Sequence, residues 1–230
     1  MRIGILLAGH TPDHIQQTHG DFDSMFARLL GGNGFTFAAW DVEHLEFPDN
    51  PHDADGWLIS GSRHGAYEDH AFIPKLEDFI RRVYTSNVPL VGICFGHQII
   101  AQALGGTVEK FDGGWGLGRH VYETADGRQL ALNAWHQDQV VVLPADASPV
   151  ARNAFCENAM LVYGSRAFTV QAHPEFEPDL VADYITHRRG TGTYPDDRLD
   201  QAARALAQPL DNAHLGHAIA TFLKTGVAHV

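Results

Sequence analysis

Short, apolar runs alternate with helix-like segments over the first 110 residues, and this alternation limits the fold more than any other feature. Strands are expected at residues 3–7, 35–40, 55–60 and 88–93, and amphipathic helices at 21–30, 73–84 and 96–104. Helices placed between fully apolar strands are typical of a parallel sheet that is covered on both faces. We therefore predict an α/β fold, a three-layer sandwich around a mostly parallel central sheet.

The middle of the chain has a different pattern. Asp126-Gly127 separates two extended runs at 119–124 and 129–132, which is a hairpin signal. Further short strands are expected at 140–143, 160–163 and 168–171. These runs predict that a small antiparallel sheet joins the parallel one.

Helix returns from Pro178, and two more amphipathic helices are expected at 196–206 and 212–225. We expect one domain over residues 1–230, with a core of about 1–186 and a helical C-terminal extension of about 187–230. The two extension helices are expected to pack against the sheet, and the alternative is a cap or a dimer surface.

Composition and charge exclude several classes of partner. The net charge of −12 argues against nucleic acid or an anionic membrane surface, because both need a basic face. No run of 18 apolar residues occurs, so no membrane span is expected. The two cysteines, Cys94 and Cys156, are too few for a disulfide framework or a cysteine-built zinc site. We expect a location in the reducing cytoplasm.

Cys94 lies at the centre of the strongest local motif, Gly92-Ile93-Cys94-Phe95-Gly96. An apolar strand enters the motif and a helix leaves it, which is the layout of a nucleophile elbow with sulfur in place of the serine oxygen. The helix N-terminus favours a thiolate. Buried cysteines are also common in proteins. The motif alone therefore leaves open a catalytic cysteine and a structural one.

A thiolate nucleophile usually works with a base that a third group orients. His173 and Glu175, in the run Gln171–Phe176, are the best candidates. Pro174 disfavours helix at His173, and residues two apart on an extended chain point to the same side. Glu175 could then hold one ring nitrogen while the other faces Cys94. The alternative is a loop histidine beside a helix-capping glutamate.

An amide-cleaving site also needs donors for an oxyanion. The N–H of Phe95 directly follows the nucleophile. A second donor is expected in the small-residue loop 59–63, where the alternative is a simple strand-to-helix turn. All three pieces follow predicted strands, and ligand sites of parallel sheets lie at the carboxyl ends of the strands.

Together these residues resemble the class I glutamine amidotransferases of the Cys-His-Glu triad type. The matching motifs occur in family order and cover about residues 1–186: Gly61-Ser62-Arg63, Gly92–Gln98 closed by Gly105-Gly106, the His-x-Asp-x-Val segment 136–140, and His-Pro-Glu-Phe at 173–176. The chain is similar to stand-alone domains like the amidotransferase half of GMP synthase, a group that includes plant gamma-glutamyl peptidases. The resemblance implies a flavodoxin-like sandwich.

The resemblance also assigns roles to residues. Cys94 would be the nucleophile, His173 the base and acid, and Glu175 the orienting group. Gly61 and Phe95 would supply the oxyanion N–H groups.

Three further residues would contact the substrate, namely Ser62, Gln98 and His136. For Gln98 the alternative is helix packing, and His136 could instead support the loop over the site. His97 is expected to be structural, because a pair of ligands is not a metal site.

The expected activity is hydrolysis of the glutamine side-chain amide through a gamma-glutamyl thioester. The alternatives are a gamma-glutamyl peptidase or hydrolase on the same triad, and a non-catalytic regulatory module. No Gly-rich phosphate loop follows residue 186, so an ammonia-accepting synthase would be a partner in trans. No cofactor is implied, because thiol-based amide hydrolysis needs none.

Overall fold

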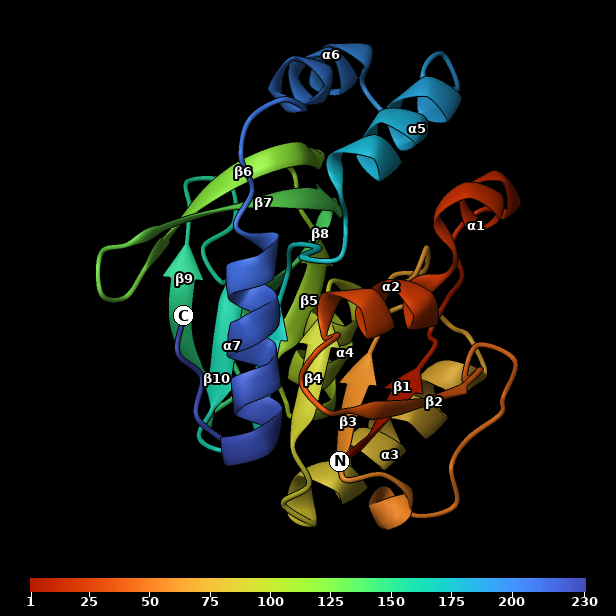
Figure 1. Cartoon of the computed structure of the whole chain (residues 1–230), viewed down its shortest axis with the longest axis vertical. Helices are drawn as coiled ribbons and strands as arrows, with labels where there is room; N and C mark the ends of the chain where they lie inside the picture. Colours follow the sequence, from red (N-terminus) through yellow and green to blue (C-terminus); the bar gives the residue numbers. More distant parts are fainter.

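The computed structural model describes residues 1–230 and centres on one nine-stranded sheet with the order β2-β1-β3-β4-β11-β10-β9-β6-β7 (Figure 1). The first five strands in this order pair in parallel and the other four pair antiparallel. Their bounds are β1 Arg2–Leu6, β2 Thr36–Trp40, β3 Gly56–Ile59, β4 Leu90–Ile93, β6 Gly116–Thr124, β7 Gln129–His136, β9 Ser148–Arg152, β10 Met160–Tyr163 and β11 Ala167–Val170. A separate two-stranded sheet pairs β5 Thr107–Lys110 with β8 Asp138–Val142. The predicted fold class is confirmed.

Helices cover both faces of the sheet. One face carries α2 Phe22–Leu29, α5 Pro178–Arg188 and α7 Asn212–Thr225, whose apolar side chains share one core cluster. The other face carries α3 Phe72–Thr85 and α4 Phe95–Ala103, which share a second cluster. Figure 1 shows α2 and α7 in front of the strands, with α3 and α4 behind them. This arrangement leaves the carboxyl ends of β3, β4 and β11 together at one edge.

One α-helix and two strands were not indicated by the sequence patterns. Helix α1, Asp13–His19, buries only Ile15, so it has no apolar stripe to reveal it. Strand β5 buries only Val108. Strand β9 contains Pro149, and proline within a run argues against a strand.

The hairpin is longer than its sequence pattern. Strands β6 and β7 pair from Glu123–Gln129 at the turn to Gly116–His136 at the far end. His136 is therefore the last residue of strand β7. An isolated bridge pairs Asn133 of β7 with His173. The antiparallel part of the sheet thus reaches the segment that follows β11.

The C-terminal extension packs against the sheet, as expected. The ring of Phe222 in α7 lies 5.8 Å from the ring of Phe168 in β11, and Phe222 is fully buried. Helix α6, Asp196–Ala205, packs on β6, where a Cβ on Gly118 would lie 2.5 Å from Cβ of Ala202. None of the helices combines the length and the apolar character needed to cross a membrane.

Candidate active site

Cys94 connects β4 to α4 in a backbone conformation that is rare for a side chain with a Cβ. Its φ is 54° and its ψ is −103°. Such conformations cost about 1–3 kcal/mol and persist only where the surroundings impose them. Here the Cys94 N–H donates to the carbonyl of Val170 at 2.8 Å, and its own carbonyl accepts from the N–H of Gln98 at 3.1 Å. The adjacent strand and the first helical turn together hold the cysteine in place.

The two flanking glycines allow α4 to approach the sheet this closely. A Cβ on Gly92 would lie 2.4 Å from the Gly96 carbonyl oxygen, and a Cβ on Gly96 would lie 2.3 Å from the carbonyl oxygen of Ile59. The Gly96 N–H donates to the carbonyl of Ser60 at 3.1 Å. Only glycine fits at either position, as expected for an elbow.

His173 and Glu175 are paired within the segment after β11. The Nδ1–H of His173 donates to Oε1 of Glu175 at 2.6 Å, and both side chains are almost fully buried. The sequence indicated that extended chain would bring these two side chains to the same side, but the backbone here is not extended. The Phe176 N–H donates to the His173 carbonyl at 3.2 Å, so residues 173–176 form a turn. The turn, with Pro174 inside it, folds the carboxylate back onto the ring.

The ring of His173 is fixed on its faces as well as at its nitrogens. The ring of Phe176 stacks on it at 4.0 Å and 11°, and the ring of Phe22 lies 6.4 Å away. Burial lowers the pKa of His173, but the charges of Glu175 and Cys94 and hydrogen bonds to both outweigh it and raise that pKa. Since Nδ1 is bonded to Glu175, the hydrogen bond to Cys94 is made by Nε2. The imidazole is therefore held in one orientation between Glu175 and Cys94.

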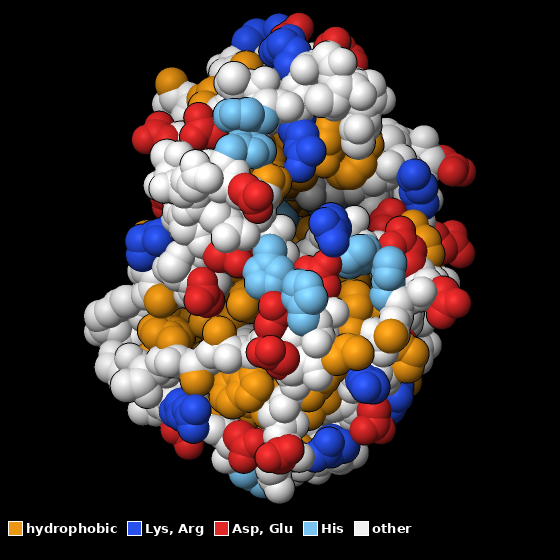
Figure 2. All heavy atoms as spheres, turned by 90° about the vertical axis from the view of Figure 1, so that its right-hand side faces the viewer, with side chains coloured by type: hydrophobic (Ala, Val, Ile, Leu, Met, Phe, Trp, Pro, Cys, Tyr) orange, Lys and Arg blue, Asp and Glu red, His pale blue; other side chains and the backbone are white.

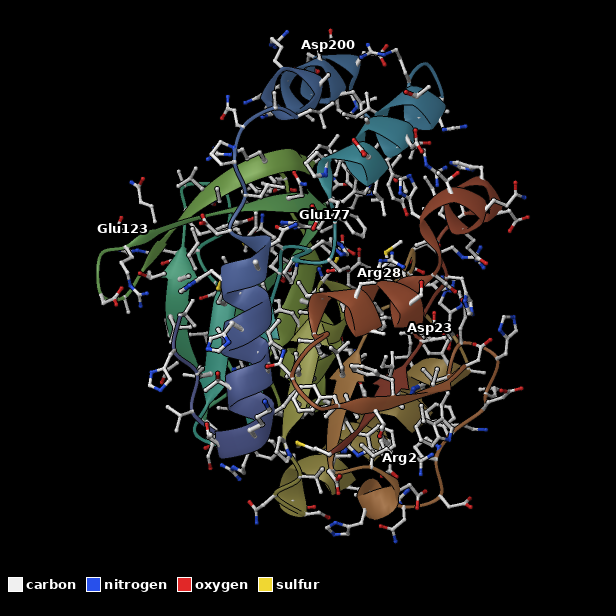
Figure 3. All side chains as sticks on the ribbon, in the orientation of Figure 1. Arg2, Asp23, Arg28, Glu123, Glu177 and Asp200 are labelled. Carbon is white, nitrogen blue, oxygen red and sulfur yellow. The ribbon has the colours of Figure 1, made fainter.

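Two asparagines from distant parts of the chain hold this turn. The Phe176 carbonyl accepts from Nδ2 of Asn133 at 2.9 Å and from Nδ2 of Asn212 at 3.1 Å. Asn212, the first residue of α7, also donates to Glu177 at 3.3 Å. Figure 3 shows Glu177 where the chain runs from β11 to α5, level with the N-terminal end of α7. The C-terminal extension thus contributes to the position of the His173 ring.

Two backbone N–H groups near Cys94 have no acceptor within the chain. The N–H of Phe95 is the first of α4, and the first N–H groups of a helix have no partner in the helix. The N–H of Gly61 donates no hydrogen bond. A Cβ on Gly61 would lie 3.0 Å from Cε1 of His173, so this loop lies directly beside the imidazole. Both N–H groups are available to an oxyanion.

A cleft of about 570 Å³ opens over these residues. Its lining includes Cys94 and His173 together with the three residues expected to contact a substrate, Ser62, Gln98 and His136. Figure 2 shows a hollow on this side of the molecule, with histidine and acidic side chains gathered around it. Cys94 of the elbow and the paired histidine His173 therefore meet in one cleft.

Comparison with known proteins identifies the family. The model of the family described as glutamine amidotransferase class-I matches residues 20–188. The chain belongs to this family. It is 32% identical to gamma-glutamyl peptidase 4 of Arabidopsis thaliana over 79% of this chain and 78% of that one. It is 30% identical to the glutamine-hydrolyzing GMP synthase of Vibrio campbellii over 74% of this chain but only 32% of the synthase.

A solved glutamine amidotransferase from Thermotoga maritima shares the fold. It superimposes with a TM-score of 0.74, covering 98% of this chain and 97% of that one, at 22% identity. The sheet order and the C-terminal helices described above are thus within the range of class-I amidotransferase folds.

Two of the residues expected to contact the substrate, Gln98 and His136, form hydrogen bonds within the wall of the cleft. Nε2 of Gln98 donates to the Asp138 carbonyl at 2.8 Å and to Gln171 at 3.1 Å. The same Asp138 carbonyl accepts from Nδ1 of His136 at 3.1 Å. Nε2 of His136 is buried without a partner, and burial lowers the pKa of His136 to about 3. The Gln98 and His136 side chains therefore hold the backbone at Asp138, directly after β7. Ser62 lines the cleft, and its Oγ accepts a hydrogen bond from the His64 N–H at 3.1 Å.

His97 lies away from the cleft. Its ring is fully buried and Nδ1 is 2.8 Å from Oγ1 of Thr169. Burial lowers the pKa of His97 to about 3, so the ring is neutral. Packing between α4 and β11 accounts for this residue.

The carboxylate of Asp138 is a site residue that the sequence analysis did not single out. It lines the cleft and accepts a hydrogen bond from the Tyr67 hydroxyl at 3.2 Å. Burial raises the pKa of Asp138. The signal was present in the sequence, because Asp138 is the acidic residue of the His-x-Asp-x-Val segment. Its carboxylate lines the cleft beside Gln98 and His136.

Proposed function

We propose that the chain hydrolyses gamma-glutamyl amides, with glutamine as the substrate and ammonia and glutamate as the products. The observation that carries this proposal is that Cys94, in a strained elbow, lies beside the His173–Glu175 pair. Within that pair, Nδ1 of His173 and Oε1 of Glu175 are 2.6 Å apart. A structural cysteine has no need of a strained backbone, of two glycines without room for a Cβ, or of a buried histidine and carboxylate. A nucleophile with a base and an orienting group needs all of them.

The first half of the reaction forms a thioester. The Cys94 thiolate attacks the amide carbon, and the C=O electron pair moves to the oxygen. The N–H groups of Phe95 and Gly61 donate to this oxyanion, and removal of one such donor typically costs about 10²–10³ in turnover. His173 then gives its proton to the leaving nitrogen, the C–N bond breaks, and ammonia leaves.

The second half returns the enzyme to its starting state. His173 takes a proton from water, and the resulting hydroxide attacks the thioester carbon. The C–S bond breaks, glutamate leaves, and Cys94 is again a thiolate beside a protonated His173. A raised pKa suits His173 to this cycle, because the resting ring carries the proton that the leaving group needs.

The Asp138 carboxylate is the proposed acceptor for the ammonium group at the amino-acid end of the substrate. Gln98 and His136 would act through Asp138 by fixing its backbone carbonyl. Ser62 would contribute its hydroxyl from the loop that also carries Gly61.

A second candidate is cleavage of gamma-glutamyl peptide bonds by the same triad. The Arabidopsis thaliana relatives named gamma-glutamyl peptidase match most of their own length, whereas the GMP synthase match covers a third of the synthase. The cleft of about 570 Å³ is also within the roughly 300–1,000 Å³ typical of sites for drug-sized ligands. In this case the leaving group is an amino acid or a peptide. For the glutamine reaction, the acceptor of the ammonia would be a synthase partner in trans.

One set of assays separates these functions. The purified chain is incubated with glutamine and with a panel of gamma-glutamyl dipeptides, and ammonia and free amino acids are measured. Ammonia release from glutamine supports the amidotransferase half-reaction, whereas preference for dipeptides supports a peptidase. If neither substrate class is cleaved, and a thiol-reactive glutamine analogue fails to label Cys94, the chain is a non-catalytic module.

A further inference from the structure

Three potential metal ligands lie close together on the loop that joins β3 to α3. Oε2 of Glu68 is 2.8 Å from Nε2 of His70 and 3.6 Å from Nδ1 of His64. The ligand atoms of these three residues all lie within 4.8 Å of one another. Four atoms arranged tetrahedrally around zinc at about 2.1 Å lie about 3.4 Å apart, so these separations are close to those of a metal site.

A fourth residue holds the first histidine in the orientation that a ligand needs. Oε1 of Glu43, from the segment after β2, lies 2.9 Å from Nε2 of His64. Arg63 donates to the same carboxylate oxygen at 3.1 Å. Metal-binding histidines usually donate their second ring N–H to a carboxylate or a carbonyl, which directs the free nitrogen at the ion. Glu43 leaves Nδ1 of His64 to face Glu68.

We propose that His64, Glu68 and His70 bind a divalent transition-metal ion such as Zn²⁺, with Glu43 as the outer carboxylate. Two imidazoles and one carboxylate are a donor set that zinc accepts, and the remaining position would take water. The His70 and Glu68 side chains are 37% and 45% exposed, so an ion can enter from solvent. The His64 side chain is 16% exposed and forms the inner wall of the site.

This site would connect metal binding to the cleft. The His64 N–H donates to Oγ of Ser62, next to Gly61. A Cβ on Gly65 would lie 3.1 Å from the Asp138 carboxylate, and Tyr67 donates to that same carboxylate. Residues 62–67 therefore form one wall of the cleft, and an ion that joins His64 to His70 would restrict the motion of this wall.

A second cluster at the mouth of the cleft must be separated from this one in any test. His10, Asp41 and His44 also have ligand atoms within 4.8 Å of one another. The His44 side chain is 68% exposed, so His44→Ala removes a ligand from that cluster with little effect on packing. The H44A protein is the starting point for the measurements.

The test is calorimetric titration of the chelator-treated, full-length H44A protein with Zn²⁺, repeated with Co²⁺ as a spectroscopic probe. We expect saturation near one ion per chain. Loss of an outer carboxylate weakens metal binding roughly 10- to 100-fold, so adding Glu43→Gln should weaken Zn²⁺ binding within that range. Adding His70→Ala or Glu68→Gln removes a direct ligand and should weaken Zn²⁺ binding by more than that. Circular dichroism checks that each variant is folded.

His52→Ala is the matched control, because His52 is an exposed histidine outside both clusters, and it should leave binding unchanged. The site is refuted if H44A binds no ion, or if H44A with His70→Ala or with Glu68→Gln binds as tightly as H44A. Binding is measured without substrate, so these outcomes do not depend on the proposed hydrolysis.

Discussion

Gly96→Ala tests whether the close contact between α4 and β3 sets the position of the nucleophile. A Cβ at this position would lie 2.3 Å from the Ile59 carbonyl oxygen and 3.0 Å from its carbonyl carbon. Both are backbone atoms, so no side chain can rotate away. To reach even 3.0 Å, the first turn of α4 must move from β3 by about 0.7 Å. This movement carries the Phe95 N–H and Cys94 with it.

The expected effects on stability and on turnover differ in size. Overpacking typically costs about 1–3 kcal/mol. Alanine recovers up to about 1 kcal/mol over glycine within a helix. The free energy of unfolding should therefore fall by about 3 kcal/mol at most. A misplacement of about 1 Å can reduce turnover about 100-fold. Urea titration measures the first quantity, and steady-state hydrolysis of the best gamma-glutamyl substrate measures the second.

Gly56→Ala, in β3, is the matched control. Its Cβ would meet only the ends of the Leu223, Met1 and Ile3 side chains, at 3.1, 3.3 and 3.5 Å, and these can adjust. We expect G56A to keep near wild-type turnover and stability. Near wild-type turnover in a folded G96A protein would refute the role given to this contact.

Three further substitutions address the surroundings of the nucleophile. Glu175→Gln should reduce turnover by roughly 10²–10⁴-fold. The raised pKa of folded His173 gives wild type additional stability, which is present in full below pH 6.5 and is lost as the pH rises through that pKa. Glu175→Gln should remove this stability, so urea titrations of the two proteins should differ at low pH and converge in alkali. Asn212→Ala loses the hydrogen bonds to the Phe176 carbonyl and to Glu177, each worth about 1 kcal/mol, while Asn133 still holds the Phe176 carbonyl. Tm should therefore fall by about 4–8 °C, and kcat should fall more than KM changes. Asp138→Asn should raise KM about 10- to 100-fold with little change in kcat, and an unchanged KM would remove Asp138 from substrate binding.

Local chemistry made the elbow predictable from the sequence. Gly92 and Gly96 flank the cysteine because neither position has room for a Cβ, and that requirement is visible as two glycines at fixed spacing. The fully apolar strands β3 and β4 likewise revealed the parallel part of the sheet, since both are buried on both faces. The family motifs then brought His173 and Glu175 to the same site.

Contacts between distant segments were not predictable in the same way. Asn212 supports the turn after β11 from 36 residues away, and no local pattern marks a buried asparagine as a partner of a carbonyl. Gln98 and His136 were expected at the substrate, but both donate to the Asp138 carbonyl, which depends on how β7 ends beside α4. The direction of a polar side chain is decided by tertiary packing, and a motif specifies only its residue type.

The most direct test of the proposed chemistry is to trap the intermediate on Cys94. The wild-type chain and the Cys94→Ala and Cys156→Ala variants are mixed with glutamine or a gamma-glutamyl dipeptide, quenched in acid, digested and measured by mass spectrometry. Cys156 is the control, because it is the only other cysteine and is also buried. We expect a gamma-glutamyl adduct on the peptide containing Cys94 in wild type and Cys156→Ala, and neither adduct nor turnover in Cys94→Ala. Continued hydrolysis by Cys94→Ala would contradict a thioester at this residue.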